Sequence, residues 1–310
     1  MRHIPDEVVA TAVQSEEAQR ILREAFLQFG RGEAAVQQRE RTDIAGVKLS
    51  TLGAVLPQQG IAGAKVYTTI AGKFGFVVIL FSAADGRPLA TLDAGALTRI
   101  RTAACSVLAA RAVVQAQPRI LGLFGLGVQG LEHAIQMSEA FPFERVLVHD
   151  PFMIDKKTEA SLTARIGIPV ERETPEIIAN SADILVTATR SKVPLFPGRL
   201  LKEDAFVAAI GSSLPDTREL DDEALRRSKR IIVEWKPQAM GEAGDLVLAD
   251  PGLRVEDKLV ELGDLLAHPA FLTSAAPELS IYKAVGIGLA DVALGGLVYQ
   301  RLAGASEAAS

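Results

Sequence analysis

Residues 119–130 read RILGLFGLGVQG, an apolar run followed by three glycines within six positions, Gly125, Gly127 and Gly130. In a dinucleotide-binding loop the first glycine makes the strand-to-helix turn, the second lets the backbone approach a pyrophosphate, and the third lets the helix pack against the strand. A GxGxxG pattern alone is weak evidence. Here a strand-like run precedes it, the helical pattern VQGLEHAIQMSEAF follows, and the run RVLVHD ends at Asp150, 20 residues after the last glycine. The stretch therefore predicts a dinucleotide site.

The N-terminus of the helix after the loop offers N–H groups to phosphate charge. We expect the cofactor to contact the loop and the first helical turn at Gly125, Leu126, Gly127, Val128 and Gln129. The Asp150 carboxylate can accept hydrogen bonds from the adenosine ribose and would repel a 2′-phosphate, so NAD(H) is expected over NADP(H). Lys156 and Lys157 could weaken that preference, and the alternative is that Asp150 only caps a helix.

Composition limits the class of protein. With 310 residues, 48% of them hydrophobic and 23% charged, the chain is long enough for two globular domains. A net charge of −5 without a stripe of Lys and Arg argues against nucleic-acid binding. The single cysteine, Cys105, favours a reducing compartment, and the four histidines show no metal-ligand spacing. No signal-peptide pattern and no apolar run of ~18 residues occurs, so we expect a cytoplasmic protein without membrane contact.

The pattern of apolar residues changes along the chain, which predicts two regions with different secondary structure. Segments rich in Val, Ile, Thr and Phe before residue 98 predict a mostly antiparallel sheet, and residues 98–116 predict a long alanine-rich helix. From residue 119 onward short apolar runs (RILGLF, RVLVHD, ADILVTAT, AFVAAIG and RIIVEW) alternate with helical patterns, which is typical of a parallel sheet. Residues 281–302 are expected to be helical and to pack on the first domain. The fold class expected is α/β.

Cofactor contacts should extend to the carboxyl ends of two further strands, where ligands of such sheets bind. These positions are Thr187, Ala188 and Thr189 after ADILV, and Gly211 and Ser212 after AFVAAI. Ordinary turn residues at strand ends are the alternative interpretation.

Together with the glycine loop, the motifs RTAACSVLAAR, GSSLPDTREL, EAGDL and ELGDLLA resemble the ornithine cyclodeaminase/mu-crystallin family, from about Arg41 to the C-terminal helix. The resemblance implies a Rossmann-type domain, here residues 115–281, inserted into an α+β domain, here residues 1–114 with 282–310. It also implies that the α+β domain binds a small amino or imino acid and forms a homodimer. Family members exchange hydride between a nicotinamide and the Cα of such a substrate.

The resemblance also assigns site residues. Arg101 matches the helix arginine that binds the substrate carboxylate, for which a planar pair of donors is suited. Lys65 matches the strand lysine expected near the carboxylate and the reacting nitrogen, and Arg41 aligns less securely as a second carboxylate contact because Arg39 lies two places away. Without the resemblance, Arg101 would be read as a surface residue and Lys65 as an edge-strand lysine.

The sequence departs from the family pattern at two positions that affect the expected chemistry. Ser213 and Ala54 align where cyclising members carry acids, and Asp216 aligns as a turn residue. Cyclodeamination needs a general base, whereas imine reduction needs a held carboxylate, one proton and a hydride. We therefore favour an NAD(P)H-dependent cyclic imino-acid (ketimine) reductase, with Lys65 and Ser213 as catalytic residues and no metal. An ornithine cyclodeaminase and a dinucleotide-regulated ligand-binding protein of the mu-crystallin type are the alternatives.

Overall fold

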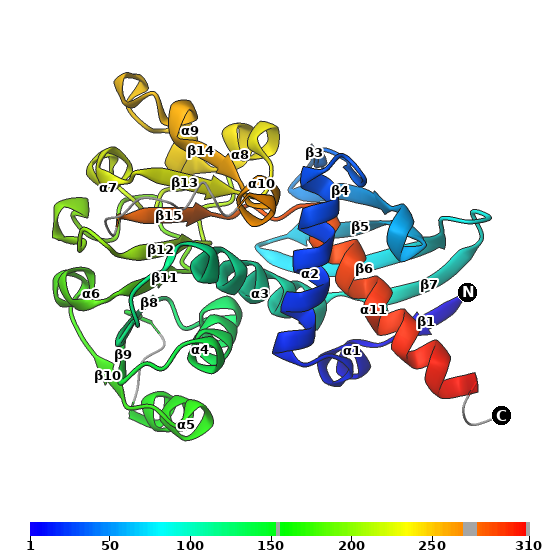
Figure 1. The fold of residues 1–310 in the computed structure, drawn as a ribbon, viewed down its shortest axis with the longest axis horizontal. Helices are drawn as coiled ribbons and strands as arrows, with labels where there is room; N and C mark the ends of the chain where they lie inside the picture. Colours follow the sequence, from blue (N-terminus) through cyan, green and yellow to red (C-terminus); the bar gives the residue numbers. More distant parts are fainter. Residues whose placement is uncertain (153–155, 269–277, 308–310) are drawn as a thin grey trace. The chain divides into compact units, whose positions relative to one another are not determined.

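A computed structural model describes residues 1–152, 156–268 and 278–307, with side chains through residue 304. The chain forms two compact units (Figure 1). One comprises Met1–Cys105 together with the C-terminal segment from Gly286, and the other comprises Ser106–Val285.

The first unit is built on a seven-stranded sheet with the order β1-β7-β6-β5-β4-β2, in which β3 also pairs with β4. Its strands are β1 (Arg2–Ile4), β2 (Ala35–Val36), β3 (Glu40–Ile44), β4 (Val47–Leu56), β5 (Ile61–Ile70), β6 (Lys73–Ser82) and β7 (Pro88–Asp93). All neighbours are antiparallel except β1 and β7, so the mostly antiparallel sheet is confirmed. Only Ala71 and Gly72 connect β5 and β6, and both have positive φ (48° and 74°), as a tight hairpin requires.

Helices cover one face of this sheet. They are α1 (Asp6–Ala12), α2 (Ser15–Gly30) and α11 (Gly288–Glu307). α11, red in Figure 1, contacts β4, β5 and β6 and packs against α2. α2 buries Ala18, Leu22, Ala25 and Phe26, which recur at the three-to-four-residue spacing of one helix face.

Helix α3 (Gly95–Val113) begins in the first unit and ends in the second. It starts and ends about one turn earlier than the predicted residues 98–116. The Asp6 carboxylate accepts a hydrogen bond from the Ala96 N–H at 2.8 Å and so serves as a cap supplied by a distant segment. Local sequence could not show this cap.

The second unit contains an eight-stranded sheet with the order β10-β9-β8-β11-β12-β15-β13-β14. Its strands are β8 (Ile120–Phe124), β9 (Arg145–His149), β10 (Val170–Arg172), β11 (Ile184–Thr187), β12 (Phe206–Ala209), β13 (Arg230–Val233), β14 (Leu259–Glu261) and β15 (Ser280–Lys283). Every pair is parallel, and the five predicted strands are all present. Strand order reverses at β8, which makes this a Rossmann-type sheet and confirms the α/β class.

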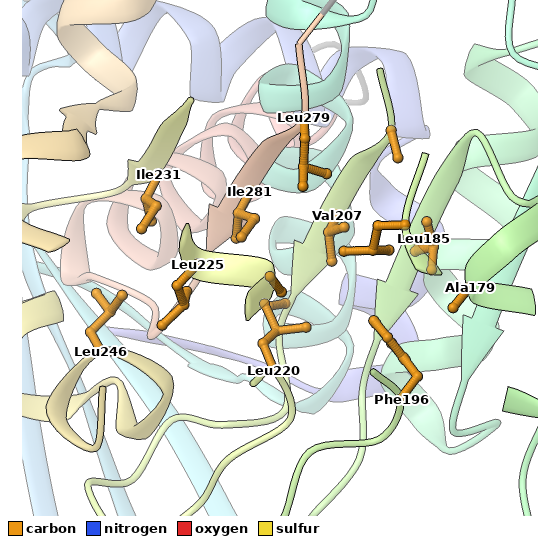
Figure 2. Packing of buried hydrophobic residues seen from close by; sticks show 14 of the residues in the cluster. Ala179, Leu185, Phe196, Val207, Leu220, Leu225, Ile231, Leu246, Leu279 and Ile281 are labelled. Atoms are coloured by element: carbon orange, nitrogen blue, oxygen red, sulfur yellow. The ribbon is translucent and has the colours of Figure 1, made fainter. Parts of the chain in front are cut away.

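Helices connect these strands. They are α4 (Val128–Ala140), α5 (Lys156–Ile166), α6 (Pro175–Ser181), α7 (Asp222–Arg227), α8 (Lys236–Glu242), α9 (Gly244–Val247) and α10 (Leu262–Ala267). A fully apolar core lies on one face of the sheet. Figure 2 shows Leu185, Val207, Ile231 and Ile281 from four strands packed with residues of the connecting segments, among them Leu225. This core fixes the strand ends that carry the predicted cofactor contacts.

The prediction of one helix over residues 281–302 is wrong in its first part. Ser280–Lys283 form β15, inserted between β12 and β13, and the helix begins only at Gly288. A short apolar run that is buried on both faces carries no periodicity to separate strand from helix.

Candidate active site

The glycine loop joins β8 to α4. Gly125 has φ +87°, and a Cβ at Gly130 would lie 1.9 Å from the carbonyl oxygen of Gly125, so both positions require glycine. Nothing lies within 4 Å of a Cβ position at Gly127, the N-cap of α4, and no side chain caps this helix. The N-terminus of α4 therefore adjoins open space suited to an anion.

Asp150 borders this loop from the end of β9. The residue is 7% exposed, and its carboxylate accepts hydrogen bonds from the N–H groups of Leu126 (2.8 Å) and Phe152 (2.9 Å). Val128, the first residue of α4, is 66% exposed. The predicted loop residues and Asp150 are thus neighbours, while the contact with a ribose stays a prediction.

Buried His133 steadies the first turn of α4. Its Nδ1 lies 2.7 Å from the Gln129 carbonyl oxygen, which only accepts hydrogen bonds, so Nδ1 carries the proton and Nε2 accepts from the Ser106 hydroxyl at 2.9 Å. Burial lowers the pKa of His133 to about 4, which keeps the ring neutral.

The ends of β11 and β12 are tied together by a residue that sequence reasoning missed. Glu219, fully buried, accepts hydrogen bonds from the Thr187 hydroxyl (2.8 Å) and from the N–H and hydroxyl of Thr189 (both 2.7 Å). It also accepts from the N–H groups of Gly211 (2.8 Å) and Ser212 (3.2 Å). One carboxylate thereby fixes four of the five predicted strand-end contacts. The fifth, Ala188, donates its N–H to the Phe124 carbonyl oxygen across β11 and β8 (2.8 Å).

A second buried acid supports Glu219. Asp245 accepts hydrogen bonds from the N–H groups of Glu219 (2.7 Å) and Leu220 (2.9 Å) and forms an ion pair with Lys283 (2.9 Å). Lys283 also donates to the Ala209 carbonyl oxygen at the end of β12. Burial, together with the charge of Asp245, raises the pKa of Glu219. The motif GSSLPDTREL contained Glu219, but its letters alone do not show which donors an acid will meet.

In the first unit, three distant segments bring charged side chains together. Lys65 on β5 and Arg101 on α3 both donate to Oδ1 of Asp291 in the first turn of α11, at 3.2 and 3.1 Å. The three side chains are 3%, 7% and 0% exposed. Lys65 also donates to the hydroxyl of Thr98, one turn before Arg101 on α3 (2.7 Å).

In this cluster two cations share one carboxylate oxygen. Arg39 donates to the Gly286 carbonyl oxygen (2.7 Å), and a Cβ at Gly286 would lie 2.9 Å from the Arg101 guanidinium. Burial, aided by the positive charges of Arg101 and Arg39 and opposed by Asp291, lowers the pKa of Lys65 to about 7. Because Lys65 and Arg101 share a single carboxylate oxygen, an additional anion beside Lys65 would stabilise its ammonium.

The other residues singled out in the sequence lie on β3, on β4 and in the segment after β12. Arg41 is half-buried on β3 opposite Ser50, and alternation along the paired strands puts it on the same sheet face as Lys65. Ser213 is half-buried, donates its N–H to the Gly211 carbonyl oxygen, and belongs to the second unit. Asp216 is exposed and forms an ion pair with Lys192. Ala54 is a buried residue of β4.

A parallel sheet with a glycine loop, joined to a unit with a buried cationic cluster, defines a dinucleotide-dependent class of protein. The chain belongs to the ornithine cyclodeaminase/mu-crystallin family, whose family model matches residues 7–306. The predicted family is thereby confirmed.

Individual relatives agree with this placement. The chain is 30% identical to the ketimine reductase mu-crystallin of Mus musculus over 72% of this chain and 68% of that protein. It is also 30% identical to a Delta(1)-pyrroline-2-carboxylate reductase of Bacillus cereus, over 84% and 78%. The crystal structure of a probable ornithine cyclodeaminase from Bordetella pertussis Tohama I is 57% identical with a TM-score of 0.97, covering 99% of this chain and 98% of that chain. None of the helices in the described ranges has the length and apolar character needed to span a bilayer.

Replacing Asp291 tests the charge balance of the cluster. Asp291→Ala leaves Lys65 and Arg101 buried without their shared carboxylate, and we expect it to lower the free energy of unfolding by about 3–5 kcal/mol in urea denaturation. Glu24→Ala, which removes the exposed ion pair with Arg20 on α2, is the control and should change nothing measurable. Equal stability of the two variants would contradict the description of the cluster.

Proposed function

We propose that the protein is an NAD(P)H-dependent reductase of small imino acids, acting on the C–N bond and most readily on cyclic ketimines. The strongest support is the buried Lys65–Arg101–Asp291 cluster, in which an ammonium and a guanidinium share one carboxylate oxygen. The names of the mouse and Bacillus cereus relatives point to the same chemistry. In this proposal Ser106–Val285 binds the dinucleotide, and the other unit binds the substrate and forms a homodimer.

The residues of the second unit fit a nicotinamide dinucleotide. Open space over Gly127 at the N-terminus of α4 suits the pyrophosphate of the dinucleotide. The strand ends held by Glu219 suit the rest of the dinucleotide. Asp150 favours NAD(H), because its carboxylate would accept from ribose hydroxyls and repel a 2′-phosphate. When bound, the dinucleotide supplies the hydride.

The first unit binds the imino acid and controls its proton. Arg101 holds the substrate carboxylate through a planar pair of N–H donors. Burial is the main cause of the lowered pKa of Lys65, and the incoming negative charge opposes it, which raises the pKa of Lys65 and keeps its ammonium protonated. Lys65 then donates a hydrogen bond, or a proton, to the substrate nitrogen, and Ser213 contributes a second hydrogen bond.

Ornithine cyclodeamination is the second candidate, because the 57% identical Bordetella protein is described as a probable ornithine cyclodeaminase. Against it, Ser213 and Ala54 stand where we align the acids of cyclising members. A protonated hydroxyl and a methyl group cannot take a proton from an amine.

Substrate turnover tests the proposal directly. We expect the protein to oxidise NADH in the presence of Δ1-pyrroline-2-carboxylate, followed by absorbance. Arg101→Ala should lower kcat/KM on the order of 10²-fold by removing charge-assisted hydrogen bonds, with the Kd for NADH changed less than about twofold. Ammonia release from ornithine with NAD would favour the cyclodeaminase instead, and tight NADH binding without turnover of either substrate would favour a binding protein.

The pH dependence of kcat/KM reports the ionisation of Lys65. Since the pKa of Lys65 is lowered to about 7, its ammonium is lost as pH rises through that value, and kcat/KM for reduction should fall there. Asp291 raises the pKa of Lys65, so Asp291→Asn should move the midpoint of the fall to lower pH. Ionisation of the substrate is the same for both proteins. Identical midpoints would therefore show that Lys65 does not control the profile.

The homodimer is proposed from the uncovered face of the seven-stranded sheet. Strand pairing places six large apolar side chains on the face opposite Lys65, each at least 38% exposed: Ile44, Val47, Leu49, Val55, Ile70 and Phe81. An apolar face of this kind marks a protein interface. Leu49→Glu should convert a dimer to a monomer in sedimentation, while Thr11→Glu, which adds the same charge on α1, should leave it intact. A monomeric wild-type protein would contradict this part of the proposal.

A further inference from the structure

We propose that Tyr67, Phe74 and Phe76 form a side-chain subsite beside Lys65, and that this subsite selects amino and imino acids with an apolar side chain or ring. This inference rests on the proposed function, because it takes Lys65 and Arg101 as the groups that hold the substrate. It defines the substrate class more narrowly than the reaction does.

Strand geometry puts the three rings on the face of the sheet that carries Lys65. Tyr67 lies two residues after Lys65 on β5, Phe76 pairs with Tyr67 across the β5–β6 ladder, and Phe74 lies two residues before Phe76. The two-residue turn between the strands fixes this register. The rings touch one another, with centroids 5.3 Å apart and planes 9° apart for Phe74 and Phe76, and centroids 5.2 Å apart for Tyr67 and Phe76.

The cluster is in direct contact with the Lys65 ammonium. Nζ lies 4.5 Å from the ring centroid of Phe76 and 5.8 Å from that of Tyr67, both within the range of a cation–π contact. A ligand that accepts a hydrogen bond from Lys65 therefore has these rings as immediate neighbours.

The rings retain surface that a ligand can cover. Phe74 is 51% exposed, and Tyr67 and Phe76 are half-buried. Farther along the same face α11 covers the sheet, where Val292 packs over Gly63. The aromatic surface thus lies beyond the helix-covered part of the sheet. Covering aromatic carbon with an apolar side chain is favourable, and stacking of a ring adds to it.

Charge on this face disfavours a cationic side chain. The Lys65 ammonium itself lies 4.5 Å from the ring centroid of Phe76. A second ammonium group placed against these rings, as in ornithine, would therefore be repelled by it. Apolar side chains avoid that repulsion and gain the contact with the rings.

Ligand binding to the protein saturated with NADH tests the subsite without requiring turnover. Calorimetric titration compares L-alanine, L-proline, L-phenylalanine, L-ornithine and L-glutamate. We expect L-phenylalanine and L-proline to bind at least about tenfold more tightly than L-ornithine, which corresponds to about 1.4 kcal/mol. Phe76→Ala should weaken L-phenylalanine about tenfold and L-alanine less than about twofold, since the L-alanine side chain does not reach the rings. Phe76→Leu should retain most of the affinity.

Two further variants show whether an effect of Phe76→Ala comes from the subsite or from misfolding. Phe74→Ala changes an exposed ring and should reduce the preference for L-phenylalanine in the same direction. Thr68→Ala, on β5 but on the opposite face, should leave it unchanged. An unchanged ratio of L-phenylalanine to L-alanine affinity in both ring variants would overturn the subsite, as would tightest binding of L-ornithine or L-glutamate. Selective binding without imine reduction would support the subsite and overturn the reductase, whereas binding of no amino acid would overturn both.

Discussion

A single buried carboxylate oxygen, Oδ1 of Asp291, holds the Lys65 ammonium and the Arg101 guanidinium in place. Burying three charges costs free energy, and this cost is offset only when all three segments are in contact. A sheet strand, a connecting helix and the C-terminal helix must therefore pack together. Because the return of the chain after the inserted unit supplies the carboxylate, the proposed substrate site and the fold of the first unit depend on the same contact.

The inserted unit is also organised by a buried carboxylate. Glu219 gathers donors from the ends of β11 and β12, and Asp245 with Lys283 holds Glu219 from behind. In both units a buried acid accepts several hydrogen bonds and fixes the groups that donate them. The difference is that the donors around Glu219 are mostly backbone groups fixed by the sheet, whereas the donors to Asp291 are charged side chains, of which Lys65 titrates near neutral pH.

The sequence was most informative where backbone geometry demands particular residues. Gly125 and Gly130 could be recognised because no other residue fits, and the alternating apolar runs predicted the central strands. Arg101 and Lys65 entered only through the family resemblance. The roles of Asp291 and Glu219 could not be read from the sequence. The partners of Asp291 lie 190 and 226 residues away, and Glu219 joins the ends of two different strands. The same reason explains the two element errors, since α3 is capped from the N-terminus and β15 is defined by neighbouring strands.

The central claim is that burial, together with the positive charge of Arg101, destabilises the Lys65 ammonium and that the substrate carboxylate stabilises it. Labelling the lysine side chains and following the Lys65 signal by NMR through a pH titration measures its pKa with and without a bound carboxylate ligand such as L-proline. The account predicts a pKa of about 7 in the ligand-free protein and a clear rise when L-proline is bound. An ordinary lysine pKa that does not respond to the ligand would contradict it.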